Sequence, residues 1–177
     1  MNKFRRTWIS LAMATGLVLL FAGSQLADNQ SKERTFHAKL DGGHETPAIS
    51  TVATGEFRAK LNSAGDELSY ELTYSGLEGG NTLFAHVHFA QTGVAGGVMF
   101  FLCGGGGKPA CPNVEATVTG TVNASNVIGP AGQGISAGQF DEVIRAMRDG
   151  LSYANVHTVT FQAGEIRGQI NDNSAEQ

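Results

Sequence analysis

Apolar and polar residues alternate along much of the chain, and this period of two limits the fold more than any other feature. In the segment 35–40, Phe36, Ala38 and Leu40 are apolar and the residues between them are polar. The same alternation runs through 56–61 and 67–74. Because successive side chains of a strand point to opposite faces, the pattern predicts antiparallel strands with one face buried and the other in water.

Further short strands are expected later in the chain, separated by turn residues such as glycine and asparagine. They cover residues 82–90, 97–103, 114–122, 153–161 and 165–170. About eight short strands with frequent turns predict an all-β fold, an antiparallel β-sandwich. Residues 136–149 instead place apolar side chains at helical spacing between Phe140 and Met147, which predicts one short amphipathic helix with Ser136 as its N-cap.

The first 24 residues have the features of an export signal. Basic residues and no acidic residue lie in 1–8, an apolar run follows at 9–22, and small residues precede the expected cleavage after Ser24. An uncleaved N-terminal anchor is the alternative, although the run is short for a membrane span. The sequence therefore predicts an exported protein (secreted, periplasmic or on the cell surface) with no membrane span after cleavage. Its expected parts are a signal peptide at 1–24, a flexible segment at 25–33, one domain at 34–171 and a disordered tail at 172–177.

The charge of the chain argues against two classes of partner. The chain has 12 Lys and Arg residues against 16 Asp and Glu residues, a net charge of −4. Cleavage after Ser24 leaves 9 basic and 16 acidic residues, a net charge of −7. The basic residues are scattered singly, so neither nucleic acid nor an anionic membrane surface is expected as a partner.

The two cysteines, Cys103 and Cys111, predict a disulfide, because an exported protein reaches an oxidising compartment. A cysteine–metal site is the alternative, but the sequence has no CxxC motif to support it.

Three histidines form the candidate site. His86 and His88 are two positions apart on a predicted strand, so their side chains project from the same face, and His157 lies on a late strand. Neutral imidazole is the commonest metal ligand of proteins, and three of them suit copper or zinc. The alternative is a polar face whose histidines only form hydrogen bonds and bind nothing.

Neighbouring polar residues would support such a site. Glu45, Asn155 and Glu165 are expected to accept hydrogen bonds from the imidazoles, which fixes their tautomers. Arg167 is expected to form a structural ion pair with Glu45. Two other histidines, His44 and His37, are expected to be solvated, with a role for His44 as a fourth ligand as the less favoured alternative.

Six segments resemble the CHRD domain, a module of the growth-factor antagonist chordin that also occurs in exported microbial proteins. They are 40–47 (LDGGHETP), 55–57 (GEF), 68–70 (LSY), 85–88 (AHVH), 153–158 (YANVHT) and 164–169 (GEIRGQ). The resemblance covers nearly the whole chain after the export signal, and the segment 103–111 looks like a local elaboration. It implies a β-sandwich with an architecture like that of Cu/Zn superoxide dismutases or immunoglobulin domains, but no defined activity.

A second, weaker likeness concerns His86 and His88, because an H-V-H sequence on a strand is similar to the copper-binding strand of Cu/Zn superoxide dismutases. The bridging histidine and the zinc loop of that family are not found, so the likeness supports metal binding and not dismutation.

Two hypotheses of function follow. The first is an exported, non-enzymatic binding module for an undefined extracellular protein or other ligand, since no catalytic residues and no G-x-S-x-G motif are found. The alternative is a copper- or zinc-binding protein that uses His86, His88 and His157 and has redox activity.

Overall fold

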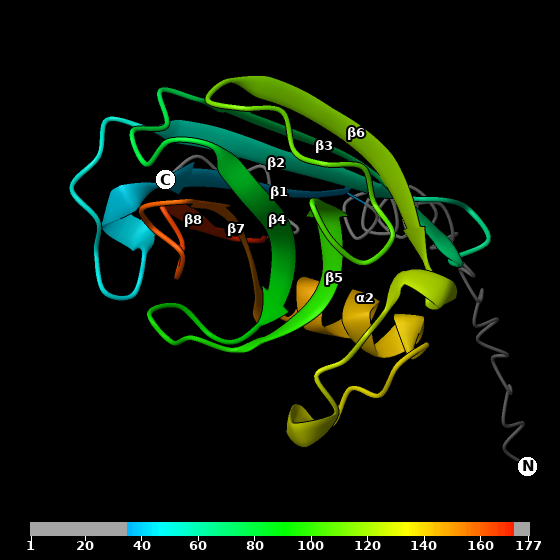
Figure 1. Cartoon of the computed structure of the whole chain (residues 1–177). Helices are drawn as coiled ribbons and strands as arrows, with labels where there is room; N and C mark the ends of the chain where they lie inside the picture. The colour runs from blue at the N-terminus through cyan, green and yellow to red at the C-terminus, as the bar shows by residue number, and fades with distance from the viewer. Residues whose placement is uncertain (1–34, 172–177) are drawn as a thin grey trace, which may run out of the picture.

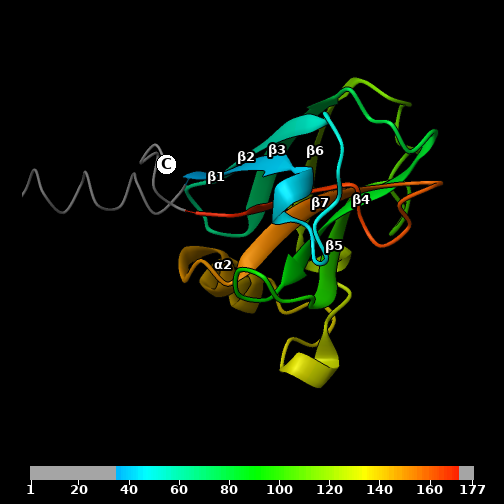
Figure 2. The ribbon, with the colours of Figure 1, turned by 90° about the vertical axis from the view of Figure 1, so that its left-hand side faces the viewer.

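The computed structural model describes residues 35–171, and eight strands of this part form one antiparallel sheet. In chain order they are β1 (Thr35–Asp41), β2 (Thr54–Leu61), β3 (Glu67–Ser75), β4 (Thr82–Phe89), β5 (Gly97–Cys103), β6 (Ala116–Asn123), β7 (Ser152–Thr158) and β8 (Ile166–Gln169). Their order across the sheet is β5-β4-β7-β8-β1-β2-β3-β6. Figures 1 and 2 show that the sheet curls, so β4 and β5 lie opposite β3 and β6 across the interior. The predicted all-β antiparallel fold is confirmed.

The core fills the space inside this curled sheet. Alternate residues of β1, β2 and β3 point into it, which follows the period of two in the sequence. Phe57, Leu68, Leu72 and Phe100 have no exposed surface. Each such side chain contributes about 1.5–3 kcal/mol through its burial, so the apolar half of the pattern holds the sheet together.

The predicted helix is present but shorter than expected. Helix α2 covers Phe140–Arg148 and lies beside the sheet (Figure 1). Its buried side chains join the core. The expected start at Ser136 is wrong, because residues 136–139 form a turn in which the Gln139 side chain accepts a hydrogen bond from the Ser136 N–H. Gly150, with a φ of 66°, takes the left-handed conformation that ends the helix.

Two strand ends differ from the prediction by more than one residue. The strand expected at 114–122 begins at Ala116, because Val114 has a φ of 62° and cannot continue a strand. The strand expected at 153–161 ends at Thr158, whose N–H turns to the Phe161 carbonyl. Residues 159–165 therefore form a loop, which contacts the candidate site.

A hydrogen bond across the interior joins strands from opposite ends of the curled sheet. The Tyr70 hydroxyl of β3 donates a hydrogen bond of 2.7 Å to the Leu102 carbonyl of β5. Cys103, at the end of β5, forms a disulfide with Cys111, as predicted. The disulfide fits an oxidising compartment.

The expected signal peptide (1–24), flexible segment (25–33) and tail (172–177) lie outside the described residues. No helix within residues 35–171 is long and apolar enough to cross a membrane.

Candidate metal centre

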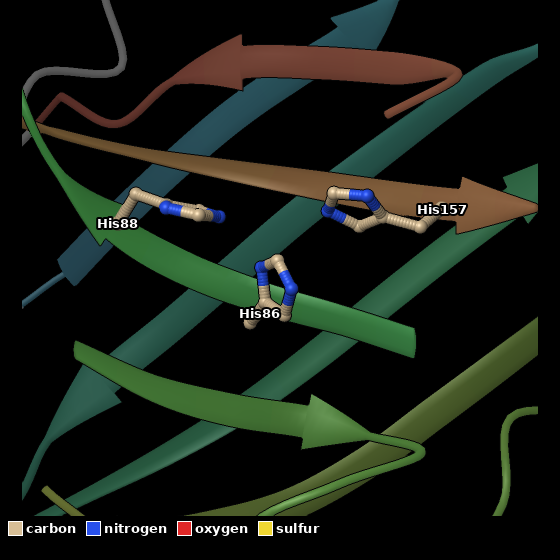
Figure 3. A group of neighbouring side chains, drawn as sticks. All are labelled: His86, His88 and His157. Atoms are coloured by element: carbon tan, nitrogen blue, oxygen red, sulfur yellow. The ribbon is translucent and has the colours of Figure 1, made fainter. Parts of the chain in front are cut away.

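The structure brings His86, His88 and His157 together on the face of the sheet that points away from the core. β4 and β7 are antiparallel neighbours, and His86 lies opposite Asn155 while His88 lies opposite Tyr153. The centroid of the His86 ring lies 4.5 Å from that of His88 and 4.4 Å from that of His157. Figure 3 shows the three rings pointing toward a common space, and one nitrogen from each lies within 4.8 Å of the others.

Main-chain carbonyls fix two of these rings. His88 Nδ1 lies 2.8 Å from the Gly96 carbonyl, and His157 Nδ1 lies 2.9 Å from the Gln162 carbonyl. A carbonyl only accepts hydrogen bonds, so each Nδ1 carries the proton and each Nε2 keeps a lone pair. Both Nε2 atoms are buried without a hydrogen-bond partner, and so is His86 Nδ1. Each of the three neighbouring histidines therefore has a buried ring nitrogen without a hydrogen-bond partner, and on His88 and His157 this nitrogen carries a lone pair.

Burial keeps these imidazoles uncharged. It lowers the pKa of His86 to about 2, with smaller contributions from the charges of His157 and His88. It also lowers the pKa of His88 to about 4, although the Gly96 carbonyl opposes the shift. The pKa of His157 is lowered by burial as well. Neutral imidazole is the form that binds metal ions, so the site needs no deprotonation before binding.

The donor set fits a transition-metal ion. Zinc binds imidazole nitrogen at about 2.0–2.1 Å, which places the nitrogens of one site about 3.3 Å apart. The three rings therefore need only small rotations to reach one ion, since their nitrogens already lie within 4.8 Å of one another. Three imidazoles without a thiolate suit copper or zinc.

A family model for the CHRD domain matches residues 36–170, which include all of the sheet except Thr35 and all three histidines. The chain belongs to the CHRD domain family. No curated protein and no solved structure gives a significant match to the chain.

The CHRD domain places an arginine and a tyrosine beside His88. The Arg167 guanidinium lies 3.4 Å from the centre of the Tyr153 ring, and that ring stacks on His88 with centroids 4.6 Å apart. Arg167 also donates hydrogen bonds to the Val94 and Gln91 carbonyls. The column of three stacked groups restricts the movement of the His88 ring.

The predicted direct ion pair between Arg167 and Glu45 is wrong. The ion pairs within residues 35–171 lie elsewhere, because loop carbonyls take the Arg167 hydrogens and Tyr153 covers its face. Arg167 acts on Glu45 only through its charge, which lowers the Glu45 pKa.

Glu45 is buried in the CHRD domain beside Asn155. Burial raises the pKa of Glu45 to about 7, although hydrogen bonds from Thr46 and Asn155 and the charge of Arg167 oppose the shift. The carboxylate lies against Gly164, where a Cβ atom would come within 2.2 Å of Oε1. Residue 164 must therefore be a glycine for Glu45 to occupy this place.

Glu165 lies away from the three rings. It is fully buried and accepts hydrogen bonds from Thr51, the Glu78 and Gly79 N–H groups, and Thr158. Its expected role as an acceptor for an imidazole is wrong, and it instead ties three loops to the sheet. His44 is exposed and pairs with Asp41, outside the cluster, and His37 is half-buried on β1.

The Gly96 and Gln162 carbonyls, which hold two of the imidazoles, were not expected from the sequence. A main-chain carbonyl leaves no mark in the choice of residue, so this role has no sequence signal. The stacking of Tyr153 had a weak signal, since Tyr153 shares strand parity with Asn155 and His157.

Proposed function

We propose that this CHRD domain is an exported module that binds one copper or zinc ion through His86, His88 and His157. The proposal is based on three neighbouring imidazoles, each of which has a buried ring nitrogen without a hydrogen-bond partner. An unpaired buried acceptor costs about 1–3 kcal/mol. A metal ion would satisfy all three, whereas a face that served only hydrogen bonding would leave them unpaired.

Two observations support export as part of the proposal. Residues 1–24 have the pattern of a signal peptide, and the Cys103–Cys111 disulfide fits an oxidising compartment. Binding of an extracellular protein stays a prediction beside this one. The metal centre is favoured because protein binding gives the three unpaired nitrogens no role.

The test is a thermal unfolding experiment on tag-free protein stripped with a chelator. Copper(II) or zinc(II) at a hundredfold excess over its Kd should stabilise the wild type by about 2.7 kcal/mol. That corresponds to a rise in Tm of about 5–10 °C for a domain of this size. The His88→Ala variant should lose the shift. The matched control His44→Ala should keep it, since His44 is exposed and outside the cluster.

Either of two results would refute metal binding at this site. The first is a wild-type Tm that no added metal changes. The second is a Tm shift in His88→Ala as large as in the wild type.

A further inference from the structure

Two oxygen acceptors beside the histidines also lack a donor. Glu45 Oε1 and Asn155 Oδ1 are buried and accept no hydrogen bond. Both residues are almost fully buried, with 8% of Glu45 and 2% of Asn155 exposed. A bound cation would give the three ring nitrogens a partner. The two oxygens would still lack a hydrogen-bond donor.

Asn155 lies next to the rings, and Glu45 lies next to Asn155. Asn155 pairs with His86 across β4 and β7, and its amide is close enough to affect the pKa values of His86, His88 and Glu45. Glu45 reaches Asn155 from the loop after β1 and is held there against Gly164. Glu45 and Asn155 thus come from different parts of the chain and lie side by side, and Asn155 adjoins His86.

Three imidazoles leave one position of a four-coordinate zinc(II) or copper(II) ion without a protein ligand. Within residues 35–171 the cluster of ligating groups contains only these three histidines, and both cysteines are joined in the disulfide. An ion that keeps an open position binds water there. A bound water has two hydrogens to donate, and two unpaired acceptors lie beside the site.

We propose that the open position of the metal ion holds one exchangeable water, whose hydrogens are accepted by Glu45 and Asn155. This inference rests on the metal site of the proposed function. It also gives the site a ligand preference. A carboxylate can only accept hydrogen bonds, whereas the Asn155 amide can present either end. Glu45 therefore favours small ligands that donate hydrogen bonds and opposes anions that only accept them.

Azide is a suitable probe, because it is a small anion that binds copper(II) and has no hydrogen to donate. The copper(II)-loaded full chain is titrated with azide at about pH 8, and the azide-to-copper charge-transfer absorption gives the Kd. The wild type should bind azide weakly. In Glu45→Gln the carboxylate is replaced by an amide of the same shape that can donate, so azide should bind at least about tenfold more tightly. The matched control is Glu71→Gln, at an exposed position on β3, and it should behave as the wild type.

A second measurement needs no variant. Electron–nuclear double resonance of the copper(II) wild type in H₂O and in D₂O should detect exchangeable protons that couple to the metal more strongly than the imidazole N–H protons do, as expected for one metal-bound water. The absence of such protons would overturn the inference, and so would equal azide affinities in the wild type and Glu45→Gln.

Metal analysis of the same samples separates the two proposals. Copper that stays bound without an exchangeable water refutes only the present inference. A chain that retains no copper or zinc refutes the proposed function and this inference together.

Discussion

Strands β1 to β3 and strand β7 follow the same alternation but differ in how far their outer faces are buried. On β1, β2 and β3 every second side chain enters the core, and the others include exposed residues such as Lys39, Arg58 and Glu71. On β7 all residues from Ser152 to Thr158 are buried, although the alternation continues. Strands β1 to β3 therefore have one face in the core and one exposed to water, whereas β7 is buried on both faces.

The difference identifies a face of the sheet whose burial is energetically unfavourable. The covered outer face of β4, β7 and β8 is polar and carries His86, His88, Asn155, His157 and Arg167. Burial of polar groups is unfavourable unless each finds a partner, and several of these groups have none. A face built only for stability would be apolar here, so the polar residues point to binding.

The largest predicted effect that separates the two faces is a loss of stability of the metal-free domain in mild acid. Burial lowers the pKa of His86 to about 2 and of His88 to about 4, from 6.5 in the unfolded chain. Below pH 6.5 the unfolded chain therefore binds protons that the folded chain does not. The free energy of unfolding should fall with pH by about 1.4 kcal/mol per pH unit for each such histidine. Urea unfolding from about pH 7 to about pH 5 measures the slope.

Glu45 opposes this effect and provides the control. Its pKa is raised from 4.5 to about 7, so over the same range the folded chain holds a proton that the unfolded chain releases. The Glu45→Gln variant should therefore lose stability more steeply in acid, by about 1.4 kcal/mol more per pH unit. A free energy of unfolding that stays constant over this range in both proteins would contradict the burial of neutral imidazoles.

A smaller effect is expected from the same substitution on the two faces. Arg167→Met removes the stacking on Tyr153 and leaves the Val94 and Gln91 carbonyls without their donor, which should cost about 3 kcal/mol. Arg58→Met, on the exposed face of β2, should cost less than about 0.5 kcal/mol, because its partner Glu56 is solvated. Urea unfolding of the metal-free variants gives both values. Equal costs would show that the outer face of β8 is no more restrictive than that of β2.

The parts of the structure that depend on strand parity could be predicted from the sequence. The period of two gave the core positions of β1 to β3 and placed His86 and His88 on a common face. Parity also places His157 on the outer face of its own strand. Its distance from His86 and His88, however, depends on β4 and β7 being neighbours, and no local sequence pattern predicts that pairing.

The remaining contacts of the site could not be predicted, because loops supply them. The Gly96 and Gln162 carbonyls are main-chain groups, so the residue types do not reveal that they accept hydrogen bonds from the imidazoles. Arg167 donates hydrogen bonds to carbonyls of the loop before β5 and not to Glu45. The position of that loop depends on the tertiary structure, so the local sequence does not predict these contacts. The late start of α2 has a similar cause, since Gln139 closes a turn with Ser136 before the helix begins.

X-ray absorption spectroscopy of the zinc- or copper-loaded wild type measures directly which atoms surround the metal. We expect three imidazole nitrogens at about 2.0–2.1 Å from the metal, and a loss of one imidazole in His88→Ala. A metal surrounded mainly by oxygen, or by the same number of imidazoles in the wild type and in His88→Ala, would contradict this expectation.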